Sequence, residues 1–274
     1  MGRVLGEVTR GTTGANRLRR VDRWLAHRAG PLLRAASAPT VVDLGFGSSP
    51  VTTIELADRL RAVAPAVEVV GLDVDAGRVA AAGAASRPGL RFAVGGFELA
   101  GMHPHVVRAA NVLRQYAEAD VAPAWAEMIS RLAPGGFAVD VTCDELGRRA
   151  AWVVLDGRGP VSLVVSCRLA SVERPSDVAE RLPKALIHHN IAGEPVHEFL
   201  TALDRAWERA ASLTAFGRRQ RWEAAVGALR DLGWPVRGPV RRWRLGEVEV
   251  AWEAVAPRLG GERGRDVDLP PRRA

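Results

Sequence analysis

Apolar runs and amphipathic segments alternate along the first half of the chain. The apolar runs lack the strict alternation of a half-exposed strand, which is typical of strands buried on both faces of a parallel sheet. We expect these strands at residues 40–44, 67–73, 90–94, 105–112 and 137–142. Helices are expected between them, at residues 50–63, 76–86 and 119–132. The alternation predicts an α/β fold with a doubly wound, mostly parallel sheet.

The second half of the chain is less regular. Apolar runs at residues 151–155 and 161–165 flank a turn that contains glycine and proline, and predict a β-hairpin. Residues 175–215 are expected to be mostly helical. We therefore expect residues 145–216 to form an insertion over the edge of the sheet where a ligand would bind.

The two ends of the chain complete this picture. A helix at residues 218–232 precedes two terminal strands, 236–244 and 247–255, which we expect to pair as an antiparallel edge of a seven-stranded sheet. A helix is expected at residues 18–33, before the first strand. The expected division of the chain is an N-terminal helical segment at 1–38, one domain at 39–256 and a mobile tail at 257–274.

The first expected strand ends in a glycine-containing turn, Asp43-Leu-Gly45-Phe-Gly47, which leads into a helix. Glycine lets the backbone turn sharply and approach a ligand, and the helix N-terminus offers free N–H groups to anions. The second strand ends in Asp73, where nucleotide-type sites hold a ribose diol. A dinucleotide fingerprint would need glycine where Pro50 stands, so a nicotinamide or flavin dinucleotide is the weaker interpretation.

This turn, with Asp73, resembles the class I S-adenosylmethionine-dependent methyltransferases over roughly residues 36–256. The sequence Leu132-Ala-Pro-Gly-Gly136 before a strand is similar to a familiar secondary mark of that family. The resemblance implies a Rossmann-like fold and S-adenosyl-L-methionine as cofactor. In that family the first acid lies near the methionine ammonium, and the second binds the ribose hydroxyls.

The resemblance also implies the remaining cofactor contacts. Many family members carry an Asp where Gly96 stands, so here Phe97 would stack on the adenine and backbone N–H groups would meet its ring nitrogens. Ala110-Asn-Val-Leu resembles a run in the chemotaxis-receptor methyltransferases, which implies that Asn111 faces the site. The implied cofactor-binding set is Asp43, Gly45, Phe46, Gly47, Ser48, Asp73, Val74, Gly96, Phe97, Ala110 and Asn111.

Composition narrows the class of protein. The chain of 274 residues has a net charge of +7, and Lys184 is its only lysine, so nearly all of its basic residues are arginine. A basic surface favours anionic substrates or nucleic acid, but arginines on helix faces are more often simply solvated. Cys143 and Cys167 fall in expected strands and are interpreted as buried thiols of a cytoplasmic protein. No His, Cys and acid spacing matches a defined metal site, so no metal is expected.

The catalytic group is not singled out by the sequence. Methyl transfer to an alcohol needs a base, and the candidates are His188, His189, His103, His105, Asp144 and Glu145. Tyr116, after the fourth strand, is expected near the transferred methyl. In the methyltransferase family that the chain resembles, segments before the core fold over the ligand as a lid. Such a lid could close on the methionine carboxylate or on the acceptor with four polar residues, Thr12, Thr13, Asn16 and Arg17.

The acceptor remains open between three hypotheses. The Gly-Thr-Thr-x-x-Asn-Arg segment before the core is similar to actinobacterial methyltransferases associated with methylated polysaccharides, which implies O-methylation of a sugar hydroxyl. An RNA methyltransferase is the second hypothesis, although no aromatic and basic single-strand platform is visible. A non-catalytic regulatory protein that binds S-adenosylmethionine is the third. We expect a small-molecule or saccharide partner.

Overall fold

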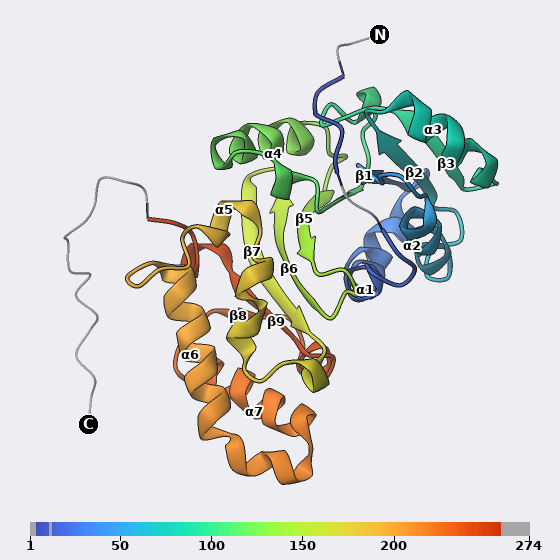
Figure 1. The fold of residues 1–274 in the computed structure, drawn as a ribbon. Helices are drawn as coiled ribbons and strands as arrows, with labels where there is room; N and C mark the ends of the chain where they lie inside the picture. The colour runs from blue at the N-terminus through green and yellow to red at the C-terminus, as the bar shows by residue number, and fades with distance from the viewer. Residues whose placement is uncertain (1–3, 11–12, 259–274) are drawn as a thin grey trace.

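A nine-stranded sheet runs through the computed structural model, which describes residues 4–10 and 13–258 (Figure 1). The strand order is β3-β2-β1-β4-β5-β6-β7-β9-β8. The strands are β1 (Thr40–Leu44), β2 (Glu68–Asp73), β3 (Leu90–Val94), β4 (Val106–Ala110), β5 (Phe137–Cys143), β6 (Arg149–Asp156), β7 (Gly159–Cys167), β8 (Val236–Arg237) and β9 (Glu247–Ala251).

The first five strands form the parallel half of the sheet, in the expected Rossmann-like order. β1 pairs with β2 on one side and with β4 on the other, so the connections reverse direction at β1. Ligands of open α/β sheets bind beyond the carboxyl ends of the strands at such a switch point. The register sets Asp43 of β1 beside Arg108 of β4, which brings a carboxylate and a guanidinium together in the interior.

The other four strands extend the sheet in antiparallel pairs, and the expected count of seven strands is wrong. The hairpin of β6 and β7 lies inside the sheet, because β6 pairs with β5 and β7 pairs with β9. The first part of residues 145–216 therefore forms two strands in the interior of the sheet. The rest of this segment forms helices that cover one face of the sheet (Figure 1).

The edge of the sheet differs from the expected pair of long strands. β8 has only two residues, and the following residues form the short helix α8 (Val240–Trp243) instead of a strand reaching 244. Gly238 adopts a φ of 79°, and Pro239 has no N–H to donate to a ladder. Together they stop the strand after Arg237.

Helices cover both faces of the sheet, as the doubly wound expectation requires. The helices α1 (Arg19–Ala35) and α2 (Val51–Arg61) pack on one face, around Trp24, Leu56 and Trp152. The helices α4 (Val121–Ser130), α6 (Pro195–Arg209) and α7 (Arg218–Asp231) pack on the other face. The two remaining helices are α3 (Ala76–Ala82) and α5 (Lys184–Ile187).

Other expectations about the core and the surface can be checked in the described residues. Cys143 and Cys167 are buried free thiols at the ends of β5 and β7, as expected. None of the helices in the described ranges is long and apolar enough to cross a membrane. The tail expected from residue 257 lies, apart from its first two residues, outside the described part of the chain.

Asp140 is an ionisable residue in the middle of β5, 1% exposed, and its carboxylate accepts one hydrogen bond, from Trp125 Nε1 at 3.1 Å. Burial raises the pKa of Asp140 to about 7. An unfolded aspartate titrates near about 4, so between these values the folded chain holds a proton that the unfolded chain has released. The unfolding free energy should therefore fall as pH rises from about 4 to about 7.

We predict that Asp140→Asn removes this loss. The amide can still accept the bond from Trp125, so the variant should exceed the wild type by roughly 2–4 kcal/mol at pH 8 and match it below pH 4. Urea unfolding followed by tryptophan fluorescence across pH 4–8 measures the difference. Asp231→Asn, at an exposed position, is the control and should leave the pH profile unchanged. Parallel profiles for wild type and Asp140→Asn would contradict the prediction.

Candidate cofactor and acceptor site

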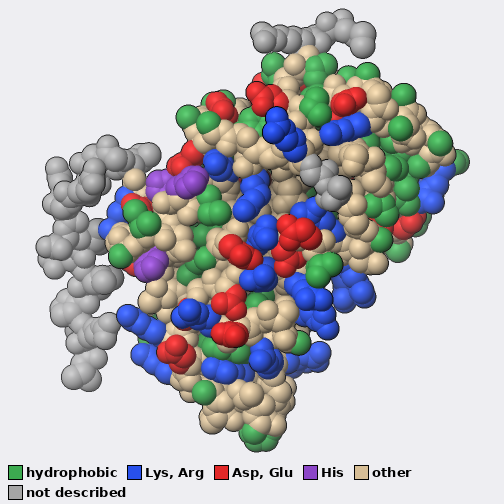
Figure 2. Space-filling model, in the orientation of Figure 1, with side chains coloured by type: hydrophobic (Ala, Val, Ile, Leu, Met, Phe, Trp, Pro, Cys, Tyr) green, Lys and Arg blue, Asp and Glu red, His purple; other side chains and the backbone are tan. Residues whose placement is uncertain are grey.

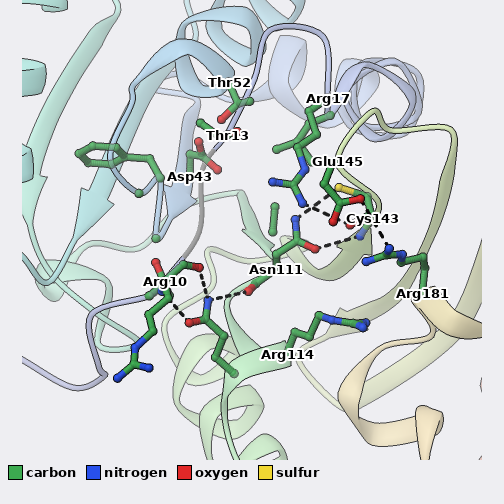
Figure 3. A pocket seen from close by; sticks show the side chains of 17 residues that line it. Arg10, Thr13, Arg17, Asp43, Thr52, Asn111, Arg114, Cys143, Glu145 and Arg181 are labelled. Carbon is green, nitrogen blue, oxygen red and sulfur yellow. Dashed lines mark hydrogen bonds and ion pairs between the residues drawn. The ribbon is translucent and has the colours of Figure 1, made fainter.

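A cleft of about 440 Å³ opens beyond the carboxyl ends of β1, β4 and β5 (Figure 3). This volume lies in the range of small-molecule sites. Six of the residues implied for cofactor binding line it: Asp43, Gly45, Phe46, Gly47, Ala110 and Asn111. The N-terminal segment contributes Thr13 and Arg17, two of the expected lid residues. Thr12 lies outside the described residues, and Asn16 does not line the cleft.

A buried ion network stands behind the wall of the cleft. Arg108, 0% exposed, donates from Nε to Asp43 Oδ1 at 2.8 Å and from Nη2 to Asp43 Oδ2 at 2.7 Å. Its Nη1 donates to Asp22 of α1, and Arg59 of α2 donates to the other oxygen of Asp22 at 2.8 Å. Thr53 completes the shell of Asp43 with a bond of 2.6 Å. Asp43 is therefore held mainly by the protein itself.

Charge and burial act in opposite directions on this network. Burial raises the pKa of Asp22 to about 6, although Arg108 and Arg59 pull it down. Burial disfavours the charged form of Arg108, but its two carboxylate partners outweigh this and raise its pKa. Each acid of the network lies against a guanidinium group, and each guanidinium group against an acid.

The glycine turn is shaped for close approach and is tied to the second acid. Gly45 has a φ of 70°, and a side chain there would meet Val112 Cγ2 at 2.6 Å, so only glycine fits. The N–H of Gly47 donates to Asp73 Oδ2 at 2.9 Å. Asp73 also accepts from the N–H of Asp75, which fixes its carboxylate beside the turn. The structure thus brings the two expected acids together at neighbouring strand ends.

Asn111 faces the cleft from the end of β4, as the sequence implied. Its φ is 58°, in the left-handed region that asparagine tolerates better than most residues. Its Oδ1 accepts from the Cys143 N–H at 3.0 Å, and its Nδ2 donates to Cys143 Sγ at 3.3 Å. These bonds between β4 and β5 fix the floor of the cleft.

A second, much smaller cavity adjoins the cleft at Gly45. Four more residues of the implied cofactor set line it, namely Asp73, Val74, Gly96 and Phe97, and so does Tyr116. Its volume is only about 20 Å³, which is room for about one water. Ser48 is exposed and lines neither cavity.

Residues 4–10 cover this small cavity. The carbonyl of Leu5 accepts from the Phe97 N–H at 2.8 Å, and the Leu5 N–H donates to Glu98 at 2.8 Å. Glu7 N–H donates to the Tyr116 hydroxyl at 2.5 Å, and Gln115 exchanges two bonds with the backbone of Arg10. The covering segment therefore uses a backbone N–H group next to the residues implied for the adenine. The large cleft has room for a small molecule, but the small cavity has no room for an adenosine group while residues 4–10 stay in place.

The expected catalytic candidates do not meet in the cleft. His188 is exposed, and His189 lies 2.7 Å from Glu118; neither lines the cleft. The Asp144 carboxylate accepts from three backbone N–H groups of its own loop, those of Leu146, Arg148 and Arg149. Tyr116 lines the small cavity, where burial raises its pKa.

Several residues of the cleft were not assigned a role by the sequence: Arg10, Arg114, Gln115 and Arg181. Glu145, which also lines the cleft, was one of the candidate bases. Arg108 was overlooked as well, although a signal existed, since an arginine inside an otherwise apolar strand needs a buried acid as partner. No group of three His, Cys, Asp or Glu side chains in the part of the chain described here could hold a metal ion.

Comparisons with known proteins identify similar folds only. No protein-family model matches the chain, and no curated protein does. The structure of human N-acetylserotonin methyltransferase in complex with SAM is similar over 48% of this chain and 40% of its own, with 21% identity and a TM-score of 0.32. The CcbJ methyltransferase of Streptomyces caelestis is similar over 57% of this chain and 68% of its own, with 20% identity and a TM-score of 0.35.

A third similar structure is a sugar N-methyltransferase from Streptoalloteichus sp. It is similar over 61% of this chain and 73% of its own, with 16% identity and a TM-score of 0.33. The chain spans less than half of the human enzyme's length. At these values none of the three similarities assigns an activity to this chain.

We predict that Arg108→Met destabilises the fold strongly, because Asp43 and Asp22 lose the buried cation between them. Breaking a buried ion pair from one side costs about 3–5 kcal/mol. The control is Arg91→Met, whose ion pair with Glu68 is half exposed and should contribute about 1 kcal/mol or less. Urea unfolding of both variants measures the losses. Equal losses in the two variants would show that the network does not stabilise this fold.

Proposed function

We propose that this protein is an S-adenosylmethionine-dependent methyltransferase. The observation that carries the proposal is the pairing of Asp43 and Asp73 at neighbouring strand ends, joined by a glycine turn whose Gly47 N–H bonds Asp73, above a cleft large enough for a small molecule. The Rossmann-like strand order at this point supports the same conclusion.

Different residues around the cleft would bind different parts of the cofactor. Asp73, Val74, Gly96 and Phe97 would hold the adenosine part once residues 4–10 move away, with Asp73 accepting from the ribose hydroxyls. The large cleft would hold the methionine part. Asp43 would contribute little direct binding there, because Arg108 and Thr53 already occupy its oxygens. S-adenosylmethionine supplies, when bound, an already activated methyl group.

The acceptor proposed from the sequence is a sugar hydroxyl. Such an acceptor has to lose a proton during transfer. Glu145 carries a carboxylate that lines the cleft and is 76% exposed, and its nearest cation is Arg181 at 3.6 Å. We therefore propose Glu145 as the proton acceptor, in place of His188, His189, Asp144 and Tyr116.

A non-catalytic protein that binds the cofactor is the second candidate. The observation in its favour is the covered adenosine side, where the Leu5 carbonyl takes the Phe97 N–H. Both candidate functions require binding of S-adenosylmethionine, but only the methyltransferase transfers the methyl group to an acceptor.

The first prediction of this proposal is cofactor binding. Calorimetry should detect binding of S-adenosylmethionine and S-adenosylhomocysteine. Asp73→Ala should weaken both about 10–100-fold, since hydrogen bonds to a charged group contribute about 1.5–3 kcal/mol. Asp75→Ala is the matched control, because its carboxylate caps α3 through the N–H groups of Gly77 and Arg78. No binding by the wild type would refute both candidates.

Transfer of a labelled methyl group separates the two candidates. Wild type should label a member of a panel of sugars and glucans, and Glu145→Gln should bind the cofactor normally but lose most of this transfer. Cofactor binding without label in sugars, glucans or total RNA would favour the non-catalytic protein. Full turnover by Glu145→Gln would remove Glu145 as the proton acceptor.

The covering segment leads to a separate prediction. Leu5→Pro deletes the N–H that donates to Glu98, so residues 4–10 should detach more easily and cofactor affinity should rise up to about fivefold, for one bond of about 1 kcal/mol. Leu5→Ala keeps that N–H and serves as control. If Leu5→Pro weakens binding, residues 4–10 close over the cofactor instead of competing with it.

A further inference from the structure

We propose that the acceptor carries a negatively charged oxygen group, a phosphate or a carboxylate, which Arg114 and Arg181 hold at the cleft. This inference rests on the proposed function and names the substrate class for the same site.

The charge balance of the cleft is the first observation. Four arginines line it, Arg10, Arg17, Arg114 and Arg181, against two carboxylates, Asp43 and Glu145. Asp43 is already compensated by Arg108 from behind the wall. The cofactor would bring one carboxylate but also an ammonium and a sulfonium, so it would not reduce this excess. The lining therefore keeps an excess of positive charge that a neutral acceptor would leave uncompensated.

Positive charge alone does not identify a binding site on this molecule. Figure 2 shows lysine and arginine side chains spread widely over one face, with acids among them. Arg17 illustrates the ordinary use of such a residue, since its Nε donates to the Asp144 carbonyl at 3.0 Å and its Nη2 to the Cys143 carbonyl at 3.4 Å. A ligand-binding arginine has to keep donors that the protein does not use.

Arg114 keeps such donors. It makes one hydrogen bond, from Nη1 to the Glu180 carbonyl at 3.2 Å, and has no ion pair with the described acids. It is only partly exposed. Burial and the nearby charge of Arg181 lower the pKa of Arg114 and outweigh the opposing effect of Glu180 and Glu145, so these two acids compensate its charge only in part.

Arg181 also lines the cleft, next to Glu145 (Figure 3). Its Nη2 lies 3.6 Å from Glu145, and its Nε lies 3.5 Å from Glu180, which Arg149 contacts more closely at 3.0 Å. The Nε atom is buried and makes no hydrogen bond. An unpaired buried donor is costly, so Arg181 would gain free energy if its guanidinium turned to bond a ligand oxygen in the cleft.

Two guanidinium groups with free donors, close enough to affect each other's charge, form a site for a shared anion. The planar fork of arginine matches the oxygens of carboxylate and phosphate, and an anion between the two groups removes their repulsion. The neighbouring floor residue, Asn111, marks where the cofactor meets the cleft in the proposed function. An acceptor anchored there by its anion would present its hydroxyl groups toward that floor.

The test uses the full chain without cofactor, and three probes that differ in charge: glucose 1-phosphate, glucuronate and methyl glucoside. Calorimetry or ligand-observed NMR should detect at least one anionic probe, at least tenfold tighter than methyl glucoside, with affinity falling as salt is added. If glucose 1-phosphate binds more tightly than glucuronate, the anionic group of the acceptor is a phosphate; if glucuronate binds more tightly, it is a carboxylate. Equal affinity for methyl glucoside, or no binding of either anionic probe at millimolar concentration, would overturn the proposal.

Variants of the two arginines then test whether they are the residues that bind the anionic probe. Arg114→Gln and Arg181→Gln should each weaken the anionic probe at least tenfold, whereas Arg174→Gln, an exposed residue of the same segment as Arg181, should have no effect. Affinity for S-adenosylhomocysteine, measured on the same variants, should stay within about twofold. If the variants lose this affinity and keep the anionic probe, the two arginines hold the cofactor and the proposal fails. Failure of the wild type to bind S-adenosylhomocysteine would instead refute the proposed function alone.

Discussion

The buried guanidinium of Arg108 is the interaction on which the geometry of the site depends. It joins β4 to Asp43 at the end of β1 and to Asp22 in α1, and through Arg59 the network reaches α2. Removing such groups from water costs several kcal/mol each, and only close pairing compensates this. In the observed arrangement α1 is docked on the sheet and each buried charge of the network faces a partner of opposite charge. That arrangement fixes Arg17 and the start of α1 beside the cleft.

The same network changes what Asp43 does. In the resemblance Asp43 is a ligand for the cofactor, but in the structure its oxygens already accept three hydrogen bonds from Arg108 and Thr53. Its charge is largely compensated before any ligand arrives. Asp73 is different, because its partners are backbone N–H groups of the turn and of its own strand end, with Arg78 at 3.5 Å. Of the two acids, Asp73 has more capacity to bind a ligand directly.

Residues 4–10 and the extended sheet act on opposite sides of the site. The segment covers the adenosine side through bonds that are mostly exposed, and such bonds contribute little stability each. A ligand that needs this space binds only the fraction of molecules in which the segment has moved, and its apparent affinity falls by that fraction. On the other side, the hairpin of β6 and β7 widens the sheet and carries the chain to Arg181, which then reaches the cleft.

The sequence by itself determined the parallel half of the fold and the identity of its ligand-binding edge. Uninterrupted apolar runs, helical periodicity and glycine turns are local patterns, and they located β1 to β5, α2 and α4 and the acids Asp43 and Asp73. The resemblance also pointed to Asn111 and the glycine turn, which line the cleft in the structure. The sequence did not determine the strand count, because a hairpin in a sheet and a hairpin in an insertion have the same local pattern.

Only the tertiary structure decided which polar groups pair with one another. Asp22 and Arg108 are 86 residues apart, and Leu5 and Phe97 are 92 apart, so no local pattern couples them. It also decided that Arg114 and Arg181 keep free donors while Arg17 does not. The physical reason is that a charge inside a fold is placed by the partner that compensates it, and that partner is chosen by the packing of the whole chain.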